Sequence, residues 1–231
     1  MKTNFLLYLT IILAGLQACE PDSSSNRVEL KLDTEPFDRI SLASSCDIKI
    51  IQSDIYQVTL TGRQKDIDDV DVNVISNSLN IAEHGQHPDD FVIRIYVPEI
   101  KDLDCSGSSF IYGESNFTQN RNMNIHLSGS GDLDFAVITN DLDLEISGSA
   151  NVLLEGSITN LDAEITGSGW VKSFKLQSDF ADVRITGSGS AEVNVTSDLD
   201  ALITGSGNVF YKGHPHVSSE ITGSGKVIDA N

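Results

Sequence analysis

Carboxylate side chains recur at a regular spacing in the second half of the sequence, and they are its clearest candidates for chemistry. Asp143 and Glu145 are followed 19 residues later by Asp162 and Glu164 in the same local order. Paired carboxylates are ligands that Ca²⁺ prefers, so these four residues predict a calcium site if the fold stacks them. The alternative is a solvated acidic surface, since like charges about 4.8 Å apart repel by only roughly 0.9 kcal/mol in water.

Catalysis has few candidate residues. Enzymes that act on polysaccharides need clustered carboxylates or a basic residue in a groove. Three residues at nearly equal spacing in the sequence form such a combination: Glu145, Glu164 and Arg184. His126 lies one repeat from Asp104, but no positioned nucleophile accompanies it. The other histidines fall in polar or proline-containing segments typical of exposed loops: His84, His87, His214 and His216. We therefore expect no enzyme, and no cofactor other than Ca²⁺.

Aromatic side chains are scarce, at 6% of the residues, so two that share a repeat position stand out. Phe110 and Trp170 each lie three residues after a recurring glycine, at a position predicted to face solvent. Exposed aromatic rings stack on sugars or on partner proteins. The two residues predict a ligand-stacking surface, with scattered surface aromatics as the alternative.

The chain has three cysteines, and the compartment decides what they can do. In an exported protein Cys46 and Cys105 could pair as a disulfide. Two separate buried thiols are the alternative, because Cys105 falls at a repeat position predicted to face the interior. The third, Cys19, lies at the end of an apolar N-terminal run.

The elements that must position these residues are encoded by a repeat. A Gly-Ser-Gly motif, or a one-residue variant of it, recurs every 18–22 residues. Its first glycines are Gly107, Gly129, Gly148, Gly167, Gly187, Gly205 and Gly223. Aliphatic residues occupy most of the positions that lie two and four residues before each glycine and four residues after it. A fixed period of this length is typical of stacked repeats.

Alternation of apolar and polar residues on both sides of the glycines predicts two strands per repeat, joined by a Gly-Ser-Gly corner. One repeat buries about six aliphatic side chains at roughly 1.5–3 kcal/mol each, against about 1–2 kcal/mol of ordering per residue, so repeats must stack. We predict an all-β fold, a parallel β-helix with about two strands in each coil of 18–22 residues. An antiparallel β-sandwich with glycine hairpins is the alternative. The open ends of a β-helix favour self-association.

The N-terminal segment reads as an export signal. Lys2 precedes an apolar run from Phe5 to Leu16, which is shorter than the ~20 residues that span a bilayer. After this run, Leu16-Gln17-Ala18-Cys19 is a sequence like the lipidation site of bacterial lipoproteins. We predict a signal peptide over residues 1–18, a lipid on Cys19 with a flexible tether over residues 19–27, and a folded domain over residues 28–231. The expected location is the outer membrane, facing the periplasm or the cell surface.

Charge excludes one class of partner. The chain carries 15 Lys and Arg against 34 Asp and Glu, a net charge of −19. It therefore lacks the basic surface that nucleic acids require. The expected partners are the membrane, reached through the lipid, and a surface glycan or protein.

Several short β-like segments precede the glycine repeats in a characteristic order. They are Pro36–Leu42, Cys46–Gln52, Asn77–Ile81, Val92–Pro98 and Leu103–Ser108. This order resembles the head GIN domain family of auto-transporter adhesins, over roughly residues 28–231. The resemblance implies an all-β, solenoid-like domain in the cell envelope and brings no enzymatic site.

These observations predict a lipid-anchored, β-helical binding or adhesion module without catalysis. A purely structural envelope protein is one alternative. A polysaccharide-active β-helix enzyme is the other.

Overall fold

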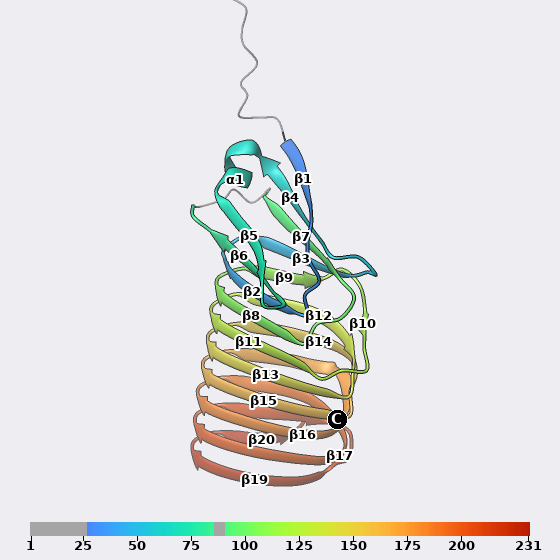
Figure 1. Ribbon diagram of the computed structural model, residues 1–231. Coiled ribbons are helices and arrows are strands. Elements are labelled where there is room, and N and C mark those ends of the chain that lie inside the picture. The colour runs from blue at the N-terminus through green and yellow to red at the C-terminus, as the bar shows by residue number, and fades with distance from the viewer. Residues whose placement is uncertain (1–26, 86–90) are drawn as a thin grey trace, which may run out of the picture.

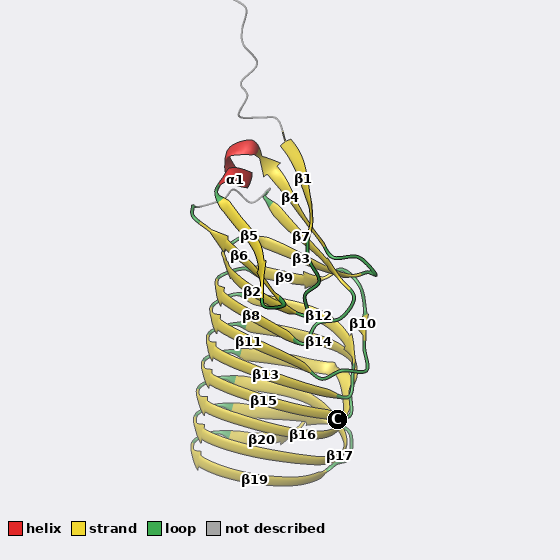
Figure 2. Cartoon of the chain, viewed as in Figure 1, coloured by secondary structure: helices red, strands yellow, loops and turns green. Residues whose placement is uncertain are grey.

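The computed structural model describes residues 27–85 and 91–231, and strands make up most of them (Figure 2). The predicted signal peptide, Cys19 and His87 lie outside these residues. The described part of the chain has a single short helix, α1 (Gln64–Asp68). No helix in residues 27–85 or 91–231 has the length and apolar character needed to cross a membrane.

Two parallel ladders of strands run along the molecule and meet at the glycine corners (Figure 1). The first ladder holds the strands that end at the corner glycines: β8 (Asp102–Gly107), β11 (Met123–Gly129), β13 (Asp141–Gly148), β15 (Asn160–Gly167), the later parts of β16 (Trp170–Gly187) and β17 (Ser190–Gly205), and β19 (His216–Gly223). The second ladder holds the strands that follow the corners: β9 (Phe110–Gly113), β12 (Asp132–Ile138), β14 (Asn151–Ser157), the earlier parts of β16 and β17, β18 (Asn208–Lys212) and β20 (Lys226–Asp229), with the short β10 (Phe117–Thr118) beside β12.

Each strand pairs in parallel with the equivalent strand one turn further on. Thus β11 pairs with β13 in the first ladder and β12 with β14 in the second. The predicted parallel β-helix with two strands per coil is confirmed, and the β-sandwich alternative is wrong.

The corner glycines stack in register from Gly107 to Gly223. Gly167 has a φ of +122°, and a Cβ at this position would lie 2.4 Å from the carbonyl oxygen of Gly148. Glycine tolerates both this dihedral and this close approach because it has no side chain. The next residue, Ser168, donates its main-chain N–H to the same carbonyl at 2.8 Å. A main-chain hydrogen-bond ladder therefore holds the corner together.

Aliphatic columns fill the space between the two ladders. Ile146, Ile165 and Ile185 are at most 1% exposed. In earlier turns the rings of Phe117 and Phe135 stack with centroids 4.9 Å apart, and both are fully buried. Each turn completes the core of its neighbours, which is why the repeat cannot fold singly.

The N-terminal part closes one end of the solenoid, and its chain order differs from its stacking order. The turn made by β2 (Arg39–Ser44) and β3 (Asp47–Gln52) pairs with β8 and β9 on one side. On its other side it pairs with β6 (Ser78–Glu83) and β7 (Val92–Val97).

Antiparallel strands complete this end. β4 (Gln57–Arg63) pairs with β7 and with β1 (Arg27–Asp33), and β5 (Val70–Ile75) pairs with β6. Together with α1 they form a cap over the first turns (Figure 1).

Candidate functional site

The four carboxylates predicted to bind calcium come together on the outer surface of the first ladder. β13 and β15 place Asp143 beside Asp162 and Glu145 beside Glu164. However, Arg184 on the next turn donates to Asp162 at 2.8 Å, so one of the four already has a cationic partner. Within residues 27–85 and 91–231 no group of three or more His, Cys, Asp or Glu is arranged to hold a metal ion. Calcium binding by this surface stays a prediction.

Charge repulsion on this surface can be tested at Asp143. Burial raises the pKa of its carboxyl, and the carboxylates of Asp162 and Asp141 raise it further. The raised pKa means that the charged form is disfavoured in the folded protein, so stability falls as pH rises through it. We expect Asp143→Asn to raise the melting temperature at pH 7 by about 1–2 °C, which corresponds to at most ~0.5 kcal/mol for an exposed group. The gain should be smaller at pH 4, because the raised pKa makes the wild-type carboxyl protonated more often there than an ordinary aspartate.

Asp229 provides a control of opposite sign. Its pKa is lowered because the main-chain and side-chain N–H groups of Asn231 donate to its carboxylate. Asp229→Asn should therefore not raise the melting temperature at pH 7. Thermal denaturation at both pH values measures the two variants, and a destabilised Asp143→Asn at pH 7 would contradict the repulsion argument.

The residues considered for catalysis form a row across three turns. Glu145, Glu164 and Arg184 are neighbours in register, but the guanidinium of Arg184 is directed to Asp162 and to Asp182, the latter at 2.6 Å. Arg184 is thus held by two aspartates of the neighbouring row, Asp162 and Asp182. Arg184 therefore has a structural role as an ion-pairing residue.

His126 lies in a shallow depression of about 270 Å³ on the same surface. Its Nδ1 contacts Glu145 at 3.1 Å, and Asp104 lies beside it on β8. Ser128, on the same strand, donates its hydroxyl to the main-chain oxygen of Cys105 at 3.4 Å. The serine is therefore engaged with the backbone rather than with the imidazole.

The two aromatic residues predicted to stack on a ligand lie on the outer surface of the second ladder. Trp170 is 40% exposed, and the ammonium of Lys172 lies 5.0 Å from the centroid of its ring. Phe110 stacks on Tyr112 with ring centroids 4.1 Å apart. In the second ladder, two strands lie between the strands that carry Phe110 and Trp170. Three strand spacings of ~4.8 Å therefore separate the two residues, about 14 Å in all. They form two aromatic patches rather than one continuous surface.

Cys46 and Cys105 are free thiols, and both are buried. The structure has no disulfide between them, and it shows the alternative of two separate buried thiols. Ser44 Oγ is 3.4 Å from Cys46 Sγ, and Ser109 donates to Ser44 Oγ at 3.0 Å. Burial raises the pKa of both thiols, which keeps them protonated.

A mixed-polarity pocket that the sequence did not indicate lies where the cap meets the first turns. We call it the junction pocket, and its volume is about 320 Å³. Its lining comes from loops at strand ends opposite the glycine corners: Phe37, Asp38, Gln52, Asp54, Tyr56, Asn77, Pro98, Glu99 and Arg121. Loops on a rigid scaffold are common locations of binding residues.

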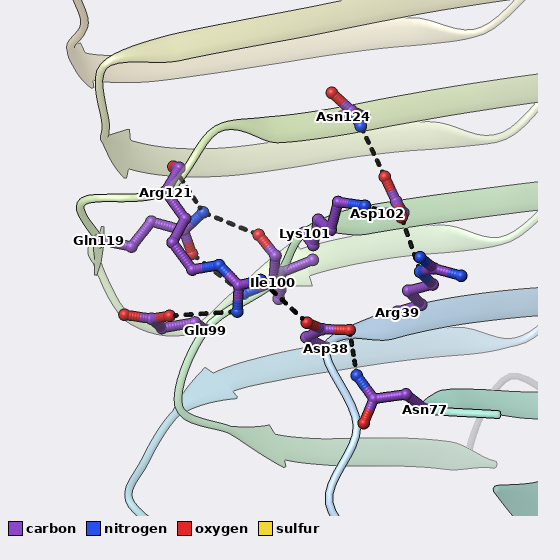
Figure 3. Close-up of polar contacts among 10 residues, drawn as sticks. All are labelled: Asp38, Arg39, Asn77, Glu99, Ile100, Lys101, Asp102, Gln119, Arg121 and Asn124. Atoms are coloured by element: carbon purple, nitrogen blue, oxygen red, sulfur yellow. Dashed lines mark hydrogen bonds and ion pairs between the residues drawn. The ribbon is translucent and has the colours of Figure 1, made fainter. Parts of the chain in front are cut away.

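Arg121 organises one wall of the junction pocket, as Figure 3 shows. Its guanidinium lies 3.2 Å from Asp38 Oδ2 and 3.7 Å from Glu99 Oε2. Asp38 also accepts a hydrogen bond from Asn77 Nδ2 at 2.5 Å. Asn77 has a φ of +67° in the tight turn between β5 and β6, a conformation that asparagine tolerates. The wall is thus assembled from four separate chain segments.

The loop that carries Arg121 is itself fixed. Gln119 accepts from the main-chain N–H of Ile100 at 3.0 Å and donates to its carbonyl at 2.7 Å (Figure 3). Nearby, Asp102 pairs with Arg39 at 3.1 Å and accepts from Asn124 at 2.6 Å, which ties three successive turns together. These contacts hold the pocket wall in one position.

The aromatic side of the pocket is equally fixed. Tyr56 packs edge to face on Phe37, with ring centroids 5.5 Å apart, and Phe37 is buried. Gln52 donates to the carbonyls of Pro98 and Thr118 at 2.8 and 2.9 Å. The pocket therefore combines an aromatic ring, carboxylates, amides and one guanidinium on a preorganised frame.

A family model described as "Putative auto-transporter adhesin, head GIN domain" matches residues 36–215. The chain belongs to this family. The match spans the N-terminal turns around the junction pocket and most of the glycine repeats, and it confirms the resemblance in the sequence. The comparison of this head GIN domain with curated proteins finds no match.

Solved structures share the fold of this head GIN domain. A "putative adhesin" of Bacteroides fragilis NCTC 9343 has a TM-score of 0.83 at 21% identity, over 89% of this chain and 97% of that one. A "putative lipid binding protein" of Parabacteroides distasonis ATCC 8503 has a TM-score of 0.71 at 24% identity, over 89% and 98% of the two chains. A "putative adhesin" of Parabacteroides merdae ATCC 43184 has a TM-score of 0.69 at 23% identity, over 90% and 97%.

Proposed function

We propose that this protein is a lipid-anchored, non-catalytic binding module of the cell envelope, held at the outer membrane and facing the periplasm or the cell surface. The family is named for adhesion, and the solved neighbours are named for adhesion or lipid binding, which supports binding rather than turnover. The proposed ligand is a surface glycan, with a surface protein as the other candidate.

The exposed indole of Trp170 carries this proposal. It stands on the second ladder between Asn151 and Ser190, which are its neighbours on the adjoining turns. An aromatic face flanked by amide and hydroxyl groups suits a sugar ring, whose C–H face is apolar and whose edge is polar. Lys172 lies over the indole, so a sugar stacking on that face displaces the ammonium. The stacked strands keep these groups in one plane.

Replacing Trp170 tests the proposal. We expect Trp170→Ala to reduce glycan retention on an array by about 5–10-fold, because ring stacking and the buried area of the indole are both lost. Phe180→Ala is the matched control, since Phe180 is 45% exposed but lies in the first ladder. Equal retention by wild type and Trp170→Ala would remove Trp170 from the binding surface. Absence of any retained ligand would favour a purely structural envelope role.

Self-association belongs to the same proposal. Ile221, the last-turn equivalent of Ile203, is 40% exposed, while Ile203 is fully buried. In the described part of the chain β19 pairs on one side only, with β17. An open strand edge with an apolar interior favours pairing with another chain, and this pairing stays a prediction.

A further inference from the structure

We infer that the junction pocket binds one neutral or amino sugar residue of a surface glycan. This inference rests on the proposed function and adds a second contact site, distinct from Trp170, with a defined ligand class. It starts from the size of the pocket. A volume of about 320 Å³ lies at the lower end of the range of small-molecule pockets, about 300–1,000 Å³, which suits a single ring rather than an extended chain.

The chemistry of the lining matches a polyhydroxylated ring. Asp38, Asp54 and Glu99 supply hydrogen-bond acceptors, and Arg121 supplies donors. Tyr56 adds an aromatic ring, which packs on the apolar C–H face of a sugar. Sugar hydroxyls both donate and accept hydrogen bonds. A wall that alternates carboxylate acceptors with a guanidinium donor therefore satisfies both roles of these hydroxyls.

Charge narrows the ligand class. Three carboxylates line the pocket against one guanidinium, and that guanidinium is already flanked by Asp38 and Glu99. A uronic acid, a sialic acid or a phosphorylated sugar would meet net repulsion. A neutral hexose meets none, and the ammonium of an amino sugar gains attraction.

Preorganisation favours binding over a purely structural role for the network. Asp38, Asn77 and Arg121 hold one another in place, so a ligand does not have to order the wall. Asp54 is exposed at the mouth of the pocket. If the network only joined loops, neutralising the charge of Asp54 would not change what the protein binds. The effect of an Asp54 variant on sugar binding therefore separates a binding role of the network from a structural one.

The test uses the full chain in detergent and saturation-transfer NMR with single sugars. The panel contains neutral hexoses, N-acetylhexosamines, an amino sugar and a uronic acid. We expect transfer to at least one neutral or amino sugar and none to the uronic acid. Asp54→Asn should weaken binding about tenfold, since a hydrogen bond to a charged group is lost. Arg121→Gln should weaken the binding of a neutral sugar by a similar factor for the same reason.

Matched variants separate this site from the rest of the surface. Asp104→Asn changes an exposed aspartate on the first ladder, and Phe180→Ala changes an exposed aromatic ring on the same ladder. Neither residue lines the junction pocket, so both variants should leave single-sugar binding unchanged. Melting temperatures of all four variants show that they are folded. Loss of binding in Asp54→Asn alone still supports the site if Arg121→Gln proves unstable.

Several results would overturn the inference. Binding of the uronic acid, or single-sugar binding that survives both pocket variants, excludes the junction pocket as a neutral-sugar site. No single-sugar signal from a chain that retains glycans on the array also excludes it, and leaves the proposed function intact. A chain that retains no glycan on the array, yet shows the expected single-sugar binding, supports the pocket and contradicts only the Trp170 surface.

Discussion

Gly167→Ala is expected to lower the melting temperature by about 10 °C. The dihedral at Gly167, φ +122°, costs a residue with a side chain about 1–3 kcal/mol. The new Cβ would also lie 2.4 Å from the carbonyl oxygen of Gly148, so the stacked main chain must move apart. Together these effects amount to roughly 3–4 kcal/mol, and a domain of this size loses about 2–4 °C for each kcal/mol. Thermal denaturation followed by circular dichroism measures the change.

Gly85→Ala is the control for this variant. Gly85 does not have a positive φ, and a Cβ there would have Asp69 Oδ2 as its nearest neighbour at 3.5 Å, an ordinary contact. Its melting temperature should stay within about 2 °C of wild type, as for surface substitutions in general. If Gly167→Ala melted at the same temperature as Gly85→Ala, the stacked-corner explanation of the repeat would fail.

Cys19→Ala is expected to move the chain almost completely from the membrane fraction to the soluble fraction. The predicted lipid supplies the anchoring, because each buried CH₂ contributes about 0.8 kcal/mol and stable attachment takes more than one chain. Cell fractionation measures the distribution, and metabolic labelling with a radioactive fatty acid measures the lipid directly.

Cys46→Ala is the matched cysteine variant. Cys46 is a buried free thiol within the fold, so this chain should keep both the label and the membrane location. If the Cys19→Ala chain still took up the fatty-acid label, or stayed in the membrane fraction without the label, another feature would have to anchor the protein.

The repeat made most of the solenoid predictable. Seven glycines at nearly constant spacing fix which residues stack, and the structure pairs Gly148 with Gly167 and Asp143 with Asp162 as the spacing requires. The neighbouring carboxylates could therefore be foreseen from the sequence. The ion pairs that Arg184 makes with Asp162 and Asp182 could not, because the direction of the arginine side chain depends on residues of two turns at once.

The N-terminal turns were less predictable because their order in space is permuted. β2 and β3 form a turn between two turns that come later in the chain. Ser44 takes the place of a corner glycine beside Gly107, so the motif is missing where it would have marked the stacking. Period-two alternation identifies strands but does not say which strands are partners. No distinct pattern in the sequence therefore indicated the cap.

The junction pocket was missed for a related reason. Asp38, Tyr56, Asn77 and Arg121 lie in loops with no shared spacing, and only the permuted stacking brings them together. The structure has a tight turn at Ser76 and Asn77, both with positive φ, and in the sequence only the turn-favouring types of these two residues point to it. Conversely, the common repeat position of Phe110 and Trp170 suggested one surface, but two rows of other residues separate them.

Binding without conversion is the central claim, and one measurement tests it most directly. The wild-type chain is incubated with a panel of surface polysaccharides, and mass spectrometry follows both the retained glycan and any product released over time. We predict at least one glycan retained with its mass unchanged and no shorter fragments. Time-dependent release of fragments that depends on the protein would contradict the claim and identify a polysaccharide-active enzyme.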